Sequence, residues 1–209
     1  MPGQCEDLSR DRRKGEKAEI EFCQLMKDND FDTVRLQAFT KGRAASLEHQ
    51  DNHIVLADIF LIAPNNNILL AEIKEKYPNK YNSYGLEEYR LNHYLEFQKI
   101  TGIPVMYAIK DVHDEGKWFW NNLDSLIEYG PKKFMGSSWV DGREQRVLIY
   151  YFQKTWFKEI LKDLSLTRLW KRYHNYNNKK IIQKIKKFEG INKFQKTMDF
   201  LKETISDKT

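Results

Sequence analysis

The segment Leu70–Lys76, with the sequence LAEIKEK, begins as an apolar strand and then becomes charged. Alternate residues of a strand point to the same face of a sheet, so Glu72 and Lys74 are predicted to lie side by side. Buried charges are costly unless a partner group or an ion balances them. An acid and a base that continue an apolar strand therefore point to a functional site.

A turn upstream of this segment extends the pattern. The sequence Pro64-Asn65-Asn66-Asn67 separates it from the apolar segment Ile54–Ala63, which predicts a hairpin. Symmetric pairing about the turn gives three opposed pairs: Ile62 with Ile68, Phe60 with Leu70, and Asp58 with Glu72. One face of this hairpin is apolar near the turn and becomes charged away from it.

Two carboxylates a few ångströms apart repel each other unless a cation lies between them. Hard oxygen ligands at the edge of a sheet suit Mg²⁺ or Mn²⁺. Such an ion stabilises a phosphoryl transition state and lowers the pKa of a bound water, and Lys74 could orient that water or offset developing charge. The pair Asp58 and Glu72 therefore predicts a metal site.

A third acid comes from the first predicted helix, which spans about Gly15 to Asn29. Its apolar face is formed by Ala18, Phe22, Leu25 and Met26. Glu19 falls inside the arc that Phe22 and Met26 define. Completion of a metal site would explain a glutamate on the core side. The alternative is that it reaches the helix edge or pairs with a lysine.

The rest of the chain alternates between strands and helices. The predicted strands are Thr33–Phe39, Ile54–Ala63, Ile68–Lys74, Val105–Ile109, Lys117–Trp120 and Arg146–Phe152. The predicted helices are Gly15–Asn29, Leu86–Thr101, Asp124–Glu128 and Lys154–Leu164, with Gly102 at the C-cap of the second and a polar loop over Thr40–Asn52. This order predicts an α/β fold with a mixed sheet covered on both faces.

Composition limits the class of protein. The 209 residues include 41% hydrophobic and 13% aromatic residues, enough for a real core, which argues against global disorder. No apolar run approaches the roughly 20 residues that span a bilayer, and the N-terminal residues lack an apolar signal segment. Cys5 and Cys23 form neither a disulfide framework nor a metal-ligand spacing, so a reducing, cytoplasmic compartment is expected.

Charge is unevenly placed along the chain, whose net charge is +5. Residues 165–209 hold 12 Lys/Arg against 4 Asp/Glu, whereas residues 1–164 hold 23 against 26. We therefore predict a domain over residues 1–164 and a basic helical C-terminal extension over residues 165–209. A basic tail on a mildly acidic body indicates an anionic partner.

The first part of the extension interleaves cations with aromatic rings. Its candidate DNA-binding residues are Arg168, Lys171, Arg172, Lys179, Lys180 and Lys184. Cations follow phosphates and flat rings stack on bases, so this composition suits nucleic acid. The alternative is a basic amphipathic helix that packs on the body through an apolar stripe, and both can hold together.

These residues together resemble a nuclease superfamily. The sequence Arg13-Lys14-Gly15-Glu16-Lys17-Ala18-Glu19, followed by Asp58 and by Glu72-Ile73-Lys74, is similar to the PD-(D/E)xK superfamily, which has a restriction endonuclease-like fold. The opening RKG, with a glutamate four residues after the glycine, is most similar to the archaeal-type Holliday junction resolvases. The stretch LEFQKITGIPVMYAIKD resembles the helix–strand unit that follows the motif there, so the resemblance covers about Arg13 to Asp111.

The resemblance implies a divalent-metal-dependent endodeoxyribonuclease. Asp58, Glu72, the main-chain carbonyl of Ile73 and Glu19 would then be metal ligands, and Lys74 would be the catalytic lysine. Two departures stand out. Ala57 replaces the proline before Asp58, and Gln98 is followed four residues later by Gly102, so the Gln-x-x-x-Tyr motif of RecB-like exonucleases is absent at this point. The second departure argues against processive exonuclease activity.

Other polar residues have two possible interpretations. Gln98 is a candidate auxiliary group on the helix after the motif, or part of a solvated face. His49 and His53 are expected in a solvated loop rather than as a metal pair. His93 and Tyr94 are expected to pack in the core or on the surface.

Two further functions stay open from the sequence. One is a non-catalytic nucleic-acid-binding module that uses the same fold and the basic extension. The other is a nuclease subunit of a larger recombination, transposition or restriction complex. Structure-specific and sequence-specific cutting are both compatible with the motifs, and the insert Val112–Gly142 is where such specificity is expected. A homodimer is a reasonable expectation for an enzyme that cuts two strands.

Overall fold

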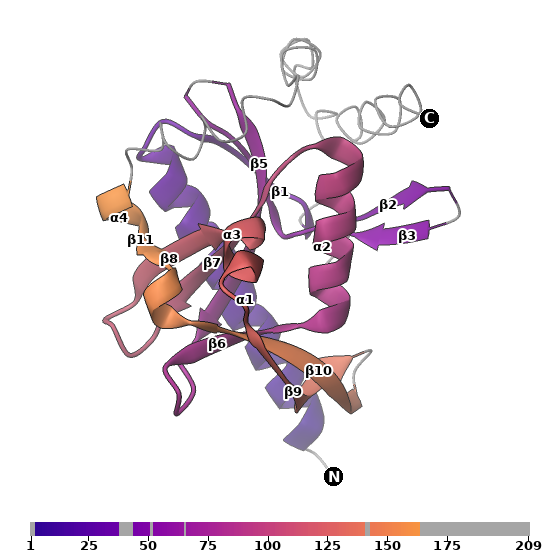
Figure 1. Ribbon diagram of the computed structural model, residues 1–209. Helices are drawn as coiled ribbons and strands as arrows, with labels where there is room; N and C mark the ends of the chain where they lie inside the picture. The colour runs from indigo at the N-terminus through magenta and orange to yellow at the C-terminus, as the bar shows by residue number, and fades with distance from the viewer. Residues whose placement is uncertain (1–2, 38–43, 51, 65, 141–142, 164–209) are drawn as a thin grey trace.

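A computed structural model describes residues 3–37, 44–50, 52–64, 66–140 and 143–163 (Figure 1). The basic extension over residues 165–209 lies outside the described residues, as do its predicted DNA-binding side chains. The predicted boundary between the two domains therefore stays a prediction. None of the described helices is both long enough and apolar enough to cross a membrane.

A six-stranded mixed sheet forms the centre of the molecule. Its strands, in spatial order, are β1 (Asp32–Arg35), β4 (Ile59–Ile62), β5 (Ile68–Lys76), β7 (Val105–Asp111), β8 (Lys117–Asn122) and β11 (Lys158–Glu159). Only the β5–β7 pair is parallel, and the other neighbours are antiparallel. The predicted α/β class with a mixed central sheet is confirmed.

The predicted hairpin is the β4–β5 pair, and its register is as expected near the turn. Ile62 pairs with Ile68 and Phe60 with Leu70. The ladder ends at the pair Ile59–Ala71, so Asp58 lies one residue beyond the last paired position.

Helix α1 (Gly3–Lys27) covers one face of the sheet (Figure 1). Phe22 and Met26 are fully buried there, in one apolar cluster with Leu69 and Ala71 of β5. The helix begins well before the predicted start at Gly15. Its first half is rich in charged helix formers and has no apolar period, so periodicity alone did not reveal it.

The other face of the sheet is covered by α2 (Glu88–Thr101), α3 (Leu123–Glu128) and a second sheet. This side sheet has the order β6 (Ser83–Glu87), β10 (Arg143–Gln153) and β9 (Lys132–Val140). Leu91 and Phe97 of α2 share an apolar cluster with Leu70 of β5 and Phe152 of β10. The positive φ of 70° at Gly102 ends α2, which confirms the predicted C-cap.

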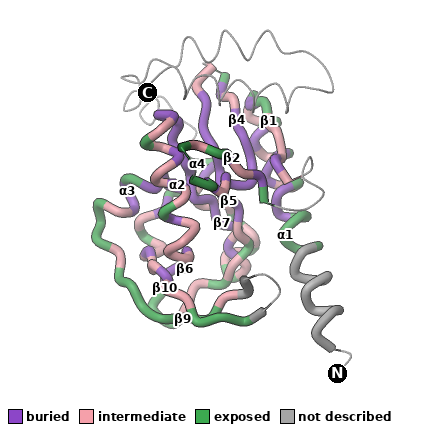
Figure 2. The backbone as a smooth tube through the Cα atoms, turned by 90° about the vertical axis from the view of Figure 1, so that its right-hand side faces the viewer, coloured by how far each residue is buried: buried purple, intermediate pink, exposed green. Residues whose placement is uncertain are grey.

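Strand β5 is buried on both faces, and its alternation assigns each side chain to one layer. Leu69 and Ala71 point toward α1, while Ile68 and Leu70 point toward α2. Glu72 continues the second set and has no exposed surface. Figure 2 shows the buried strands of the centre enclosed by more exposed segments.

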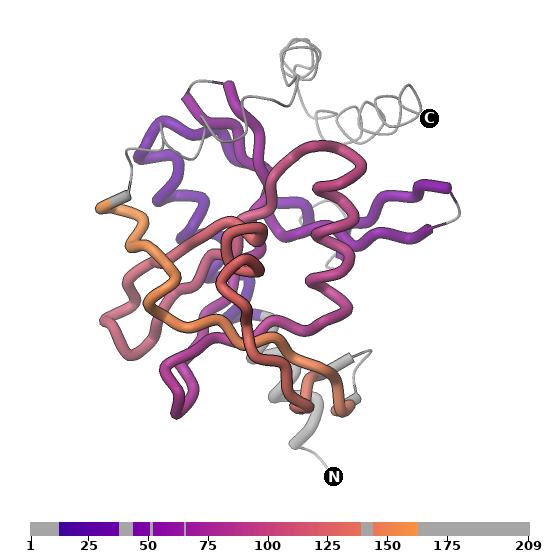
Figure 3. Tube along the Cα trace, viewed as in Figure 1, coloured from indigo at the N-terminus to yellow at the C-terminus, as the bar shows by residue number. Residues whose placement is uncertain are grey.

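Several predicted elements were wrong. The segment Ile54–Ala63 is not one strand, because β3 (Asn52–Val55) pairs with β2 (Ser46–His49) in a separate two-stranded sheet. The expected loop Thr40–Asn52 therefore contains β2. This β2–β3 hairpin projects beyond α2 (Figure 3). At the break before β4, the side chain of Asp58, rather than a backbone carbonyl, accepts from the backbone of Ile73.

Three further corrections concern the predicted helices and the insert. Helix α2 begins at Glu88 rather than Leu86, because Leu86 belongs to β6. The expected helix Lys154–Leu164 is a 3₁₀ turn (Lys154–Trp156), β11 and the short α4 (Ile160–Asp163). The insert Val112–Gly142 contains β9, which was not predicted.

Candidate active site

The side chains of Asp58, Glu72 and Lys74 meet just before β4 begins, beside the second half of β5. The Lys74 ammonium forms an ion pair with Glu72 and lies 4.0 Å from Oδ2 of Asp58. Glu72 is fully buried and Asp58 is 4% exposed, whereas the side chain of Lys74 is partly open to solvent. We define these three residues as the carboxylate cluster.

Helix α2 supplies two partners to Glu72. The Tyr94 hydroxyl donates to Oε2 at 2.6 Å, and the Arg90 guanidinium donates to Oε1 at 3.3 Å. Burial would raise the pKa of Glu72, but the charges of Lys74 and Arg90, together with hydrogen bonds from Lys74 and Tyr94, lower it to about 2. Glu72 is therefore ionised at neutral pH.

Asp58 is held differently. Gln37 donates to its Oδ1 at 2.7 Å, and the backbone N–H of Ile73 donates to its Oδ2 at 2.8 Å. Burial and the neighbouring charge of Glu72 raise the pKa of Asp58 to about 7, against the lowering effect of Lys74. Asp58 therefore titrates close to neutral pH, unlike Glu72.

The backbone of Ile73 faces the same space. The N–H and C=O groups of one strand residue point to the same edge of the strand. Because the Ile73 N–H donates to Asp58, and because the ladder with β4 has ended at Ala71, the Ile73 carbonyl is directed toward Asp58 as well. This supports the expected use of that carbonyl as a ligand.

Lys74 is an ammonium in this arrangement. Burial would lower its pKa, but the carboxylates of Glu72 and Asp58 raise it. A lysine in this state can donate hydrogen bonds and offset negative charge, whereas it cannot accept a proton from water.

Glu19 is buried, as its place on the wheel predicted, but Arg35 of β1 engages it. The guanidinium of Arg35 donates to Glu19 Oε2 at 3.0 Å and also reaches Glu16 at 3.4 Å. Burial raises the pKa of Glu19, partly offset by Arg35, and the charges of Lys74 and Glu72 also act on it. The helix acid therefore lies within electrostatic reach of the carboxylate cluster.

The three acids do not form a ready-made metal centre. Among the residues that the structure describes, no group of three histidine, cysteine, aspartate or glutamate side chains converges closely enough to hold a metal ion. Asp58 and Glu72 are neighbours, while Glu19 is held by Arg35. The expectation of three converged side-chain ligands is not met in this arrangement.

A divalent ion nevertheless fits the pair Asp58 and Glu72. Mg²⁺ commonly uses only one or two protein carboxylates and completes its shell with water and substrate phosphates. Each carboxylate oxygen of Asp58 accepts one hydrogen bond from the groups named above, and burial together with the charge of Glu72 raises its pKa, a repulsion that a bound cation would relieve. Asp58, Glu72 and the Ile73 carbonyl are the groups that could hold such an ion.

Sequence reasoning missed Arg90, Tyr94 and Gln37. Arg90 and Tyr94 are spaced i, i+4 on α2 and so project from the same face of the helix, a signal visible in the sequence. Tyr94 was expected to pack only; its ring is buried in the core, but its hydroxyl contacts Glu72. Nothing in the local sequence of Gln37 connects it with Asp58.

Other predicted site residues lie elsewhere. The amide of Gln98 donates to Asp124 at 2.8 Å and accepts from the backbone of Val105 at 2.6 Å, so it fastens the end of α2 to its neighbours rather than joining the carboxylate cluster. His53 is on β3, 2.6 Å from the carboxylate of Glu48. The expected solvated loop around it is a hairpin.

Comparison with known proteins gives matches among solved structures. No family model matches the chain, and no curated protein matches it either. The chain is similar in structure to a Holliday junction resolvase. This is the Hjc protein of the archaeal hyperthermophile Archaeoglobus fulgidus, with 14% identity and a TM-score of 0.46 over 72% of this chain and 99% of that one.

A second structural match is a nuclease from a fusselovirus, with 13% identity and a TM-score of 0.40 over 78% of this chain and 92% of that one. At these identities and scores, the roles of individual residues rest on the geometry of this chain alone.

Proposed function

We propose that this chain is a divalent-metal-dependent endodeoxyribonuclease that hydrolyses phosphodiester bonds at the carboxylate cluster. The observation that carries the proposal is the meeting of Asp58 with Glu72 and Lys74 of β5, a strand whose first four residues are apolar and buried. A fold rarely keeps two buried carboxylates beside each other for stability alone, because their repulsion is unfavourable.

Each residue has a defined task in this proposal. Asp58, Glu72 and the Ile73 carbonyl would hold Mg²⁺ or Mn²⁺, which stabilises charge on phosphate oxygens and lowers the pKa of a bound water. Lys74 orients the attacking water and offsets charge on the phosphate. Tyr94 and Arg90 orient Glu72 from the other side.

Glu19 is proposed as a more distant acid of the same site. It is positioned by Arg35, and its charge acts on the cluster rather than through direct contact with it. Whether it joins the metal shell is tested by Glu19→Gln, which should weaken Mg²⁺-dependent activity less than Asp58→Asn does.

Branched DNA is the proposed substrate, on the strength of the motifs that resemble archaeal-type Holliday junction resolvases. The basic extension over residues 165–209 is proposed to contact the DNA backbone, which would make binding strongly dependent on salt. Action on two strands would call for a homodimer, and the cytoplasm is the proposed location.

The test is cleavage of a panel of branched, single-stranded and duplex DNA with Mg²⁺ or Mn²⁺. The parent protein should cut, and chelation of the metal should stop cutting. Lys74→Ala should reduce the rate by about 100- to 1,000-fold, the usual loss for one donor to a developing charge. Lys99→Ala removes a lysine whose side chain is 77% exposed and should leave the rate unchanged.

The outcome that would overturn the proposal is equal cutting by Lys74→Ala and the parent. Salt-sensitive DNA binding that does not respond to Mg²⁺, with no cutting under any metal, would instead identify a non-catalytic binding module. A nuclease subunit of a larger complex would cut only together with proteins that copurify with it.

A further inference from the structure

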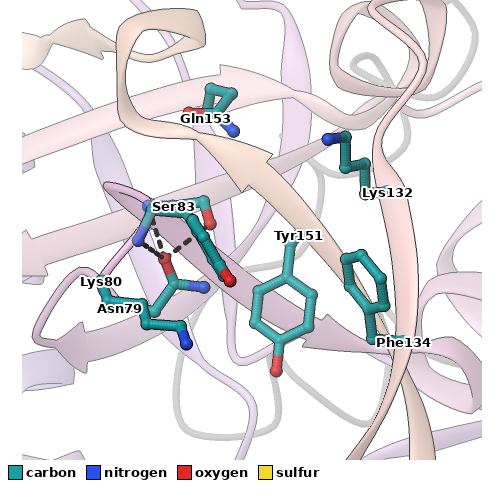
Figure 4. Close-up of a pocket in the computed structure, with 8 residues that line it drawn as sticks. Asn79, Lys80, Ser83, Lys132, Phe134, Tyr151 and Gln153 are labelled. Carbon is teal, nitrogen blue, oxygen red and sulfur yellow. Dashed lines mark hydrogen bonds between the residues drawn. The ribbon is translucent and has the colours of Figure 1, made fainter.

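A pocket on the side sheet has its own chemistry and shares no residue with the carboxylate cluster. It has a volume of about 700 Å³. Its lining comes from the loop before β6 and from all three strands of the side sheet: Asn79, Lys80, Tyr81, Ser83, Lys132, Phe134, Tyr151 and Gln153. Figure 4 shows Tyr151 between the Asn79–Ser83 segment and Phe134.

Strand alternation explains why rings lie on this face. In the side sheet, Gln153 pairs with Ser83, and Tyr151 pairs with Gly85 and Lys132. The intervening residues, such as Tyr84 and Phe152, point into the core. The pocket therefore occupies the outer face, yet Phe134 is 54% exposed there, with its ring 6.2 Å from that of Tyr151.

Two glycines leave room for the ring of Tyr151 to lie along the sheet. A Cβ atom at Gly85 would lie 3.2 Å from Cε1 of Tyr151, and one at Gly136 would lie 3.4 Å from its hydroxyl. The same atoms would meet Ile149 at 2.7 and 2.4 Å, so larger residues would displace both side chains. The absence of side chains at these positions therefore shapes the floor of the pocket.

The opposite wall is a loop with a fixed shape. Oδ1 of Asn79 accepts from the backbone of Tyr81 at 2.9 Å, from the backbone of Ser83 at 3.1 Å and from the Ser83 hydroxyl at 2.9 Å. Lys80 lies over the ring of Tyr81, which is 65% exposed. The loop thus presents a cation and a ring beside the pocket.

The charged residues of the lining are all positive. Its eight residues include Lys80 and Lys132 and no acid, and the amides of Asn79 and Gln153 add hydrogen-bonding groups. Exposed rings next to cations and amides suit a ligand that has a flat ring with polar groups at its edge and an anionic group attached to it. An unpaired nucleobase with its phosphate has this chemistry.

Strand β6 links the pocket along the chain to helix α2, which contacts the carboxylate cluster. Ser83 lines the pocket, and Glu87, four residues further along β6, directly precedes α2, from which Arg90 reaches Glu72. At about 3.3 Å per residue, Ser83 and Glu87 are roughly 13 Å apart. This short strand is the structural connection between the pocket and the helix that contacts Glu72.

We infer that this pocket binds an unpaired base of single-stranded DNA, with the base against Phe134 and Tyr151 and its phosphate near Lys80 and Lys132. The inference rests on the proposed function, because it assigns the single-stranded part of that enzyme's substrate. It predicts that DNA with unpaired bases near a duplex binds more tightly than fully paired DNA.

The test measures binding by the full-length Lys74→Ala protein without divalent metal, so that cleavage does not interfere. The ligands are a duplex of about 20 base pairs with a single-stranded extension of about six nucleotides, and the same duplex with an abasic extension. The base-bearing ligand should bind about 5- to 100-fold more tightly, the range expected from stacking of one base. Adding Phe134→Ala or Tyr151→Ala should remove most of this difference.

Tyr129→Ala is the matched control, since Tyr129 is another exposed aromatic residue, 55% exposed, outside the pocket. It should keep the difference between the two ligands. Phe134→Ala removes a side chain that is mostly in solvent and should not affect folding. Equal binding of the two ligands, or equal losses with Tyr129→Ala and Phe134→Ala, would overturn the inference.

The two proposals can fail separately. Base-dependent binding without any cutting by the parent protein would contradict the proposed nuclease activity and still support the assignment of the pocket. Cutting by the parent protein without base-dependent binding would contradict only the inference that the pocket binds a base. Self-association that Phe134→Ala abolishes, with DNA binding unchanged, would show that the pocket serves a protein contact and would also overturn the inference.

Discussion

Two neighbouring strands of the central sheet each carry a buried carboxylate, and the two have different surroundings. Glu72 on β5 and Asp111 on β7 both have no exposed surface. Each is paired with a lysine, and each accepts a hydrogen bond of 2.6 Å from a tyrosine hydroxyl. They differ in what stands beside them.

Asp111 is fully balanced. Lys154 and the Tyr84 hydroxyl donate to its Oδ2, and the backbone of His113 donates to its Oδ1 at 2.8 Å. Burial would raise the pKa of Asp111, but these donors lower it. Glu72, by contrast, has a second buried carboxylate, Asp58, next to it. The lesson is that a single buried acid with its own cation does not mark a site, whereas two buried acids side by side, one of them with a raised pKa, do.

The largest expected effect separates the two clusters by activity. Asp58→Asn should reduce the cleavage rate by about 100-fold or more, because it removes a carboxylate from the proposed metal site. Asp111→Asn should leave the rate per folded molecule unchanged. Single-turnover cleavage of a branched DNA by each protein checks this, with circular dichroism to confirm folding. A comparable loss of cleavage rate in both variants would contradict the distinction between the Asp58 and Asp111 sites.

The two tyrosines sharpen the comparison. Tyr94→Phe removes the hydroxyl that orients Glu72 and should reduce the rate by about tenfold or more, as is usual for a group that positions a metal ligand. Tyr84→Phe makes the same chemical change beside Asp111 and serves as the matched control. Equal rates for the two variants would mean that Tyr94 only packs.

Stability should respond in the opposite sense to activity. Asp111→Ala leaves the buried Tyr84 hydroxyl and the Lys154 ammonium without their shared acceptor. The expected loss in the free energy of unfolding is about 1–3 kcal/mol. Urea denaturation of the variant and the parent measures it. An unchanged midpoint would show that the Asp111 contacts contribute nothing net.

The smallest expected effect is a pH dependence of the stability that the Asp111 carboxylate contributes. Because the folded-state pKa of Asp111 lies below its ordinary value of 3.8, its carboxylate stabilises the fold fully above that value. The contribution is then lost as pH falls through the lower, folded-state pKa. The stability difference between the parent and Asp111→Asn should therefore be constant above about pH 5 and shrink below about pH 3.8. Urea titrations at several pH values check this, and a difference that grows on acidification would contradict it.

Local patterns predicted the centre of the fold well. The turn at residues 64–67 and the alternation in β5 were enough for the register of the hairpin, because both signals lie within one short stretch of chain. The β2–β3 hairpin and β9 were missed because their sequences are polar or carry small residues and lack a clear apolar alternation. Each pairs with a strand adjacent in sequence, β2 with β3 and β9 with β10, so only a turn signal between them could have revealed them.

The candidate site was predictable to the same extent. Asp58, Glu72 and Lys74 follow from one hairpin, so sequence spacing was sufficient to place them together. The engagement of Glu19 by Arg35 and the reach of Arg90 and Tyr94 to Glu72 depend on how α1 and α2 pack on the sheet. Such contacts between distant elements leave no local period in the sequence.

One carbonyl oxygen joins the side sheet to the central sheet. The carbonyl of Gly85 accepts both from the Lys76 ammonium of β5 and from the Tyr107 hydroxyl of β7, the latter at 2.7 Å. Together with the hydrogen bond from Tyr84 of β6 to Asp111, this carbonyl fastens the side sheet to the two strands that carry the buried acids. If a base is held against Tyr151, the fixed position of the side sheet sets the distance from that base to the carboxylate cluster. The bond that is cut should then lie a constant number of nucleotides from the held base, whatever the sequence between them.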